Sequence, residues 1–178
     1  MISWIRYFAC TDDSRTGKAA LQYLAGLVRV APVRLIPTSE APSMAWRPYY
    51  ERLLVTPMAG AFVNVVCTQP ERWAWTTRIQ TPARNASTGS DAAKVEPGEV
   101  VLGELELYTA GVRNVLLPQR YPSTPNEFET ASKYDAVVTQ DEFVAAEWRH
   151  NGIATTVIPF DNIDHARFRA LVLGEGVT

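Results

Sequence analysis

The chain has few of the residues that metal and disulfide sites require. Its 178 residues include two cysteines and two histidines, and neither Cys10 nor Cys67 belongs to a C-x-x-C motif. Because a structural zinc site needs a cluster of thiolate or imidazole ligands, we expect no metal. We expect the two thiols to be buried and free, as in a cytoplasmic protein.

Long hydrophobic runs and an excess of one charge are also missing. No apolar run reaches the roughly 18 residues of a membrane-spanning helix, and the start MISWIRYFAC is too short and too mixed for a signal peptide. The 17 basic and 19 acidic residues give a formal net charge of -2, which does not attract nucleic acid in general. We therefore expect a cytoplasmic protein without a membrane partner, while a local basic patch would still allow nucleic acid to bind.

Short apolar strands alternate with amphipathic helices along the sequence. Aromatic and β-branched runs predict strands at 2–10, 33–37, 61–67, 76–80, 112–118, 135–140 and 155–160. Helices are predicted from a cap at Asp13 or Ser14 to Pro32, at 47–54, at 99–111, after a cap at Thr124, and at 141–151. In the first helix, Ala20, Leu21, Leu24, Leu27 and Val28 are expected to share the buried face.

This alternation predicts an α/β fold, specifically a Rossmann-like three-layer α/β/α sandwich with a mostly parallel sheet. We assign residues 1–168 to a single domain and residues 169–178 to a C-terminal tail. Residues 81–98 are rich in Pro, Gly, Ser and Thr without periodicity, which predicts a long loop within the domain.

Polar turns follow four of the predicted strands, at residues 11–18, 68–75, 118–124 and 139–143. In such folds ligands bind at the carboxyl ends of the strands, near the point where the strand order reverses, so these turns mark the expected site. The candidate ligand-binding residues within them are Thr11, Asp12, Ser14, Gly17, Lys18, Gln69, Glu71, Arg72, Trp73, Gln119, Arg120, Thr139, Asp141 and Glu142.

The first turn, TDDSRTGK, has two interpretations. It precedes a helix and contains Lys18, as a phosphate-binding loop would. It lacks the first glycine of the G-x-x-x-x-G-K-[ST] motif, and Asp12 and Asp13 would repel an anion. A capped helix start with solvated charges is the alternative.

The second turn, TQPERWAW, combines hydrogen-bonding side chains with the rings of Trp73 and Trp75. Flat aromatic faces next to polar groups suit sugar rings or nucleobases. Packing of one or both tryptophans beneath the long loop is the alternative. Arg120 and Tyr121 in the third turn invite the same two interpretations.

We assign no catalytic residue. His150 lies at the end of a predicted helix and His165 lies in the polar exit segment, so neither belongs to the turns described above. Asp12, Glu71 or Asp141 could act as a general base only after a pKa shift, which the sequence does not reveal.

The stretch YDAVVTQDEFVAAEWRHNGIATTVIPFDNIDHARF (134–168) resembles the end of the N-terminal domain in GT-B-type glycosyltransferases of the group 4-like kind. In that family a strand ends in a small hydroxyl residue, a phenylalanine-bearing helix follows, and a glycine precedes a strand ending in V-x-P-x-G-x-D. The corresponding residues here are Thr139, Phe143, Gly152, Val157, Ile158, Pro159, Asp164 and Phe168. The glycine before the aspartate is absent from this sequence.

The resemblance implies the acceptor-side half of such an enzyme, without the domain that binds the nucleotide sugar. A nucleotide-sugar donor would then require a partner domain, from a separate chain or through a homo-oligomer, and no other cofactor is expected. We interpret the protein as a stand-alone glycosyltransferase-like N-terminal domain, a non-catalytic binding or accessory protein for a small molecule, a sugar or a protein. The alternative is a glycosyltransferase, or half of a split or dimeric one, that transfers a sugar from a nucleotide-sugar donor.

Overall fold

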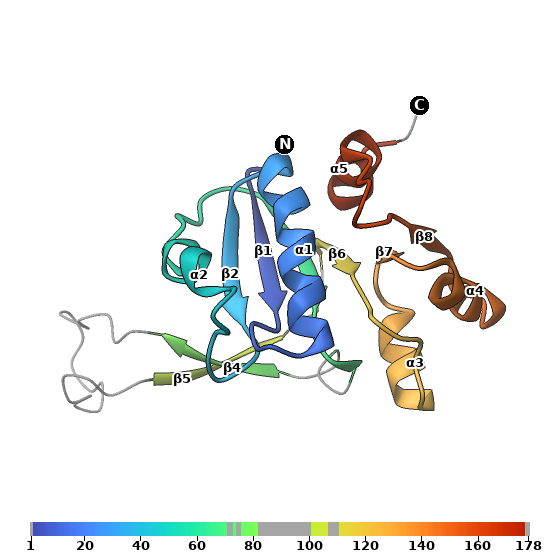
Figure 1. Cartoon of the computed structure of the whole chain (residues 1–178), viewed down its shortest axis with the longest axis horizontal. Coiled ribbons are helices and arrows are strands. Elements are labelled where there is room, and N and C mark those ends of the chain that lie inside the picture. Colours follow the sequence, from blue (N-terminus) through green and yellow to red (C-terminus); the bar gives the residue numbers. More distant parts are fainter. Residues whose placement is uncertain (1, 71–72, 74–75, 82–100, 107–110, 177–178) are drawn as a thin grey trace.

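A six-stranded sheet in which all neighbouring strands are parallel forms the centre of the molecule (Figure 1). The computed structural model describes residues 2–70, 73, 76–81, 101–106 and 111–176. The strands of this sheet are β1 (Trp4–Ala9), β2 (Val33–Pro37), β3 (Phe62–Cys67), β6 (Arg113–Leu116), β7 (Ala136–Thr139) and β8 (Thr155–Val157). The helices are α1 (Arg15–Val30), α2 (Arg47–Leu54), α3 (Pro125–Ala131), α4 (Glu142–His150) and α5 (His165–Leu173). The predicted Rossmann-like α/β sandwich is thereby confirmed.

The strand order is β2-β1-β3-β6-β7-β8. In chain order this is the arrangement of flavodoxin-like domains with one further strand, and it differs from the 3-2-1-4-5-6 order of dinucleotide-binding Rossmann domains. The chain leaves β1 toward one side of the sheet and returns to its other side at β3. The strand order therefore reverses between β1 and β3, whose carboxyl ends lie side by side.

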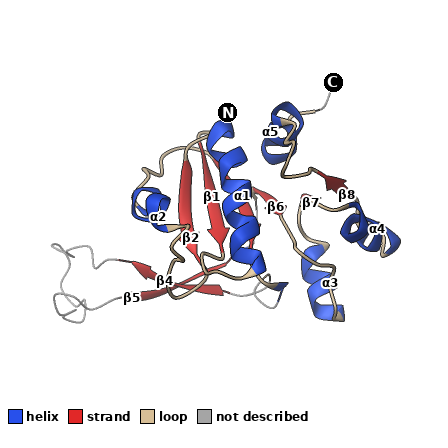
Figure 2. Cartoon of the chain, viewed as in Figure 1, coloured by secondary structure: helices blue, strands red, loops and turns tan. Residues whose placement is uncertain are grey.

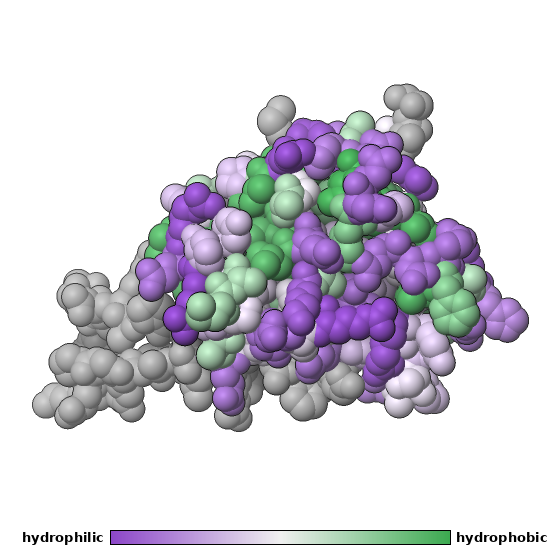
Figure 3. Space-filling model, in the orientation of Figure 1, coloured by the Kyte–Doolittle hydropathy of each residue, from purple (hydrophilic) through white to green (hydrophobic). Residues whose placement is uncertain are grey.

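Two hydrophobic clusters cover the two faces of the sheet, as the helix–sheet–helix layering requires. Figure 2 shows the helices and strands that contribute to these layers. On one face, side chains of α1, α2 and α5 pack on the strands, and Tyr23, Leu27, Leu53 and Phe168 belong to this cluster. On the other face, Trp148 of α4 packs with residues of α3 and of the central strands. On the face seen in Figure 3, hydrophilic residues surround several patches of hydrophobic ones.

Helix α1 begins where the sequence predicts. The Oγ of Ser14 accepts a hydrogen bond from the Gly17 N–H at 3.1 Å, so Ser14 is the N-cap. The predicted buried face is correct for its central residues, but Val28 is 48% exposed. Tyr23 is also buried, so the buried face of α1 is turned toward Tyr23 relative to the predicted face. Val28 therefore lies at the edge of the buried face.

The predicted helix at 99–111 is wrong for the residues that can be compared. Residues Val101–Glu106 form strand β5, which pairs antiparallel with β4 (Thr76–Thr81) in a separate two-stranded sheet. The alternation of leucine and glutamate from residue 104 to 107 has the period of a strand, and the cross-strand partner supplies the backbone hydrogen bonds. The predicted strand at 76–80 is confirmed. Of the predicted loop at 81–98, Thr81 ends β4 and the remaining residues lie outside those described.

The boundary of the predicted tail at residue 169 falls inside helix α5. Val172 is fully buried, and the ring of Phe168 stacks on Tyr23 of α1 with centroids 6.1 Å apart. Arg113 of β6 donates from Nε and Nη2 to the carbonyl of Leu171 at 3.1 and 2.8 Å. Residues 169–173 are therefore part of the packed domain, because their apolar side completes the layer over α1.

In the part of the chain that the structure describes, no helix is both long and apolar enough to cross a membrane.

A row of polar side chains, half-buried at Arg6 and fully buried at its two asparagines, crosses the sheet. Arg6, Asn64 and Asn114 occupy directly paired positions on β1, β3 and β6. The Nε of Arg6 donates to Oδ1 of Asn64 at 2.7 Å, and Nδ2 of Asn64 donates to Oδ1 of Asn114 at 2.9 Å. Both asparagines are fully buried, and Asn114 Nδ2 also donates to the Val112 carbonyl at 2.8 Å. Unlike apolar contacts, these hydrogen bonds form in only one strand register.

We expect Asn114→Ala to lower the free energy of unfolding by about 2–3 kcal/mol, because it leaves a cavity and deprives a buried amide of Asn64 of its acceptor. Urea unfolding followed by circular dichroism measures this change. The matched variant Asn162→Ala, at an exposed position, should stay within about 0.5 kcal/mol of the original protein. Equal stability of the two variants would show that the buried row contributes nothing.

Candidate functional site

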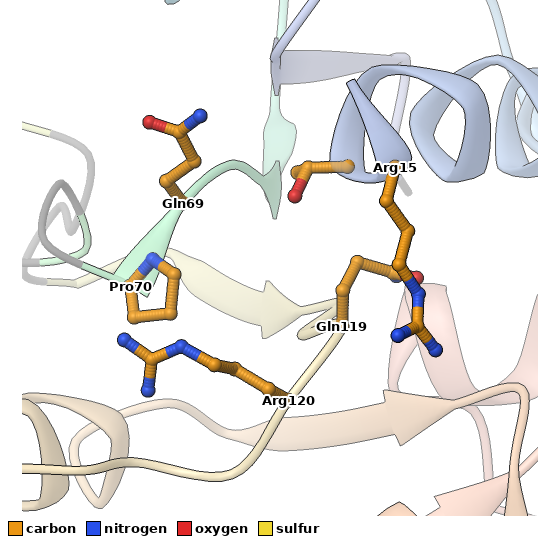
Figure 4. A pocket seen from close by; sticks show the side chains of 6 residues that line it. Arg15, Gln69, Pro70, Gln119 and Arg120 are labelled. Carbon is orange, nitrogen blue, oxygen red and sulfur yellow. The ribbon is translucent and has the colours of Figure 1, made fainter.

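A cavity of about 400 Å³ lies at the carboxyl ends of the central strands, beside the point where the strand order reverses (Figure 4). Its lining comes from the first turn of α1, the turn after β3 and the turn after β6. The lining residues are Arg15, Thr16, Gln69, Pro70, Gln119 and Arg120. The structure thus brings three of the four polar turns together, and the fourth contributes no lining residue.

Thr11 connects neighbouring loops and does not line the cavity. It is fully buried, and its N–H donates to the Oγ of Ser39 at 2.8 Å. Its carbonyl accepts from the N–H of Ser43 at 2.7 Å. Thr11 therefore joins the turn after β1 to the loop after β2.

The charged residues of the first turn make local contacts. Oδ1 of Asp12 accepts from the N–H of Ser14 at 2.9 Å. Nζ of Lys18 lies 3.6 Å from Oδ1 of Asp13, and both side chains are exposed. Lys18 does not line the cavity, so the phosphate-loop interpretation that depended on it loses its cation. A capped helix start is what the structure shows.

Gly17 is required by a close approach of the backbone. A Cβ at this position would lie 2.1 Å from the carbonyl oxygen of Asp12. The carbonyl of Gly17 also accepts a hydrogen bond from Nε1 of Trp46 at 3.1 Å. The absent side chain lets the turn fold tightly against α1, which holds the first residues of the helix at the cavity.

In the second turn the structure separates Gln69 from Trp73. Gln69 lines the cavity, whereas Trp73 is fully buried with its ring centroid 5.6 Å from that of Trp148. Nε1 of Trp73 donates to the carbonyl of Thr68 at 3.2 Å. Of the two interpretations of Trp73, packing in the core is therefore correct. Glu71, Arg72 and Trp75 lie outside the described residues.

The third turn supplies an arginine that is already paired. Arg120 donates from Nη1 and Nη2 to the two carboxylate oxygens of Glu127, each at 3.2 Å. Burial acts to raise the pKa of Glu127, but hydrogen bonds from Ser123 and Arg120 and the charge of Arg120 hold this pKa below its ordinary value. The charge of Arg120 is therefore balanced by a carboxylate of the same domain.

In the side-chain amide of Gln119, the oxygen has a hydrogen-bond partner and the nitrogen has none among the protein atoms described. Its Oε1 accepts from Nε2 of Gln140 at 3.2 Å. Its own Nε2 is buried and has no hydrogen-bond partner among the protein atoms described. A buried amide donor without a partner is costly, so an acceptor from a ligand would be favourable here.

The fourth turn is built from helix-capping contacts. The buried hydroxyl of Thr139 donates to the carbonyl of Asp141 at 3.2 Å. Oδ1 of Asp141 caps α4 by accepting from the N–H of Phe143 at 2.7 Å, and Glu142 pairs with Arg149. Each candidate residue of this turn is thus engaged in local structure.

Arg15 and Thr16 line the cavity but are absent from the residues predicted from the sequence. Arg15 is the first residue of α1, and helical side chains lean toward the N-terminus of their helix. A side chain at the first position therefore reaches out over the strand ends, whereas Lys18 starts nearly one turn further along the helix. This direction was the signal that could have identified Arg15.

The thiols offer no reactive nucleophile. Cys67 is fully buried and Cys10 nearly so, and burial raises the pKa of both. Within the described ranges, no group of three His, Cys, Asp or Glu side chains comes together in a way that could hold a metal ion.

Comparisons with protein-family models, with curated proteins and with solved structures find no match for this chain. The glycosyltransferase resemblance therefore stays a hypothesis carried by residues 134–168. Several of its residues have local structural roles. Gly152 has a φ of +84° after α4, Asp164 caps α5 by accepting from the N–H of Arg167 at 3.0 Å, and Phe168 is buried.

We expect Gly17→Ala to destabilise the protein by about 2–4 kcal/mol, since the backbone carbonyl that meets the new Cβ cannot move without disrupting the turn. The gain in helix propensity, at most about 1 kcal/mol, is too small to offset this clash. Thermal unfolding measures the difference. Gly176→Ala is the matched control, because no atom lies within 4 Å of its Cβ position. An unchanged melting temperature for Gly17→Ala would contradict the close approach.

We expect Glu127→Gln to lower stability at neutral pH and to have no effect in acid. The pKa of Glu127 is lower in the folded protein, so its stabilisation is fully present above the ordinary value of 4.5 and is lost as the pH falls through the folded value. Urea unfolding of Glu127→Gln and of the original protein at a series of pH values measures the gap, which is the difference between their free energies of unfolding. Glu129→Gln, which removes an exposed carboxylate 3.9 Å from Lys133, should give a much smaller gap. A gap for Glu127→Gln that persists in acid would show that the carboxylate charge is not its cause.

Proposed function

We propose that this domain is a non-catalytic binding or accessory protein that holds a small polar molecule in the cavity beside β1, β3 and β6. The observation that carries this proposal is the convergence of three turns, separated by some fifty residues each, on one cavity lined by amide, hydroxyl and guanidinium groups. Such groups orient polar ligands by hydrogen bonds.

The described lining favours binding over catalysis. It consists of two arginines, two glutamines, a threonine and a proline. General acid–base catalysis uses a carboxylate, an imidazole or a similar group within hydrogen-bond reach of the reacting atom. The nearby carboxylates Asp12 and Glu127 accept hydrogen bonds from the protein itself.

The size and chemistry of the cavity suit a ligand such as a monosaccharide. A volume of about 400 Å³ lies in the lower part of the usual range for small-molecule sites. The side chains of Gln69, Gln119 and Thr16 each offer both donors and acceptors, which match the hydroxyl groups of a sugar. This agrees with the acceptor-side role that the glycosyltransferase resemblance implies.

The alternative is a glycosyltransferase, or half of one, that uses a nucleotide-sugar donor. It is supported by the strand–helix–strand order of residues 136–157, which matches the resemblance. This function requires a donor-binding domain from another chain or another copy.

We expect monosaccharides or their derivatives to bind the domain, and Gln119→Ala to weaken binding by about three- to tenfold through loss of a hydrogen bond. Calorimetry against a panel of sugars, sugar phosphates and nucleotide sugars measures the affinities. Gln22→Ala, at an exposed position of α1, is the control and should bind as the original protein does.

Equal loss in both variants, or no binding by any compound of the panel, would refute a ligand site in this cavity. Transfer of a sugar from one of the nucleotide sugars would instead support the glycosyltransferase alternative.

A further inference from the structure

The cavity lining has more free hydrogen-bond donors than acceptors. A guanidinium group has five N–H donors and no acceptor, and an amide nitrogen has two. The side chains of Arg15, Thr16 and Gln69 make no hydrogen bond or ion pair within the part of the chain that the structure describes. Nε2 of Gln119 is a further unused donor. A ligand that complements this wall must be rich in acceptors.

The lining also has one unbalanced positive charge. Arg120 is paired with both oxygens of Glu127, whereas Arg15 has no ion pair among the described residues. In Figure 4 the Arg15 side chain extends from α1 toward the turn that carries Gln119 and Arg120. Among the described lining residues, the guanidinium of Arg15 is therefore a positive charge without a carboxylate partner.

The acidic residues of the first turn do not cancel this charge directly. Asp12 accepts from the N–H of Ser14, and Asp13 pairs with Lys18 on the surface. Neither residue lines the cavity. Lys18 therefore balances the charge of Asp13, whereas Asp12 keeps its negative charge outside the cavity lining.

We infer that the ligand carries one anionic, acceptor-rich group, phosphoryl or carboxylate, that pairs with Arg15 and accepts a hydrogen bond from Nε2 of Gln119. This inference rests on the proposed function, since it specifies the chemistry of the small polar molecule bound there. Arg15 is then the specificity-determining residue, because it separates charged from neutral forms of one ligand.

The test compares three matched hexoses, namely glucose, glucose 6-phosphate and glucuronate, on the intact protein. The side-chain amide signals of Gln69 and Gln119, followed by NMR during titration, report binding at the cavity itself. We expect one or both charged hexoses to bind about tenfold more tightly than glucose, with a preference that shrinks as salt is added. The two charged arms distinguish a phosphoryl from a carboxylate group.

The variant Arg15→Gln should abolish this preference, so that the charged hexoses bind no more tightly than glucose. Arg47→Gln is a matched control, because Arg47 is the exposed first residue of α2 and does not line the cavity. Equal binding of the three hexoses, or a preference that survives in Arg15→Gln, would overturn the inference and leave the proposed binding function intact. No change in either glutamine signal with any hexose would overturn both.

Discussion

The hydrogen-bonded row formed by Arg6, Asn64 and Asn114 is the constraint on which the rest of the structure depends. Apolar strands such as β3 could slide along their neighbours at modest cost, whereas a buried amide pair is satisfied in a single register. The register decides where β1, β3 and β6 end relative to one another. The turns that follow β1, β3 and β6 meet at one cavity only because the three strands end at the same edge of the sheet.

Most charged side chains near that cavity make ion pairs or hydrogen bonds within the domain. Asp13 forms an ion pair with Lys18, and Glu127 forms one with Arg120. Asp12 accepts a hydrogen bond from the N–H of Ser14. These contacts shape the turns and leave few groups for a ligand. What remains is a donor-rich wall in which Arg15 has no ion pair with any described residue, so the chemistry of the site differs from the composition of the turns that build it.

Local signals predicted the fold well and the site in part. The caps at Ser14 and Thr124 and the helix stop at Gly152 depend on neighbouring residues alone. The helix predicted at 99–111 failed because β5 takes its stability from pairing with β4, which no local pattern shows. In the same way, Trp73 has a ring suited to stacking on a ligand, and only its contact with Trp148 shows that the ring belongs to the core.

The sequence by itself determined the alternation of strands and helices, their caps, and the polar turns at the carboxyl ends of the strands, because periodicity and capping act over a few residues. The tertiary structure decided the strand order, the meeting of three turns at the cavity, and the pairing that leaves Arg15 available while Lys18 and Arg120 are engaged. These outcomes depend on contacts between distant segments, such as that between Asn64 and Asn114, fifty residues apart. Their energies depend on mutual burial and register, which residue patterns along the chain do not encode.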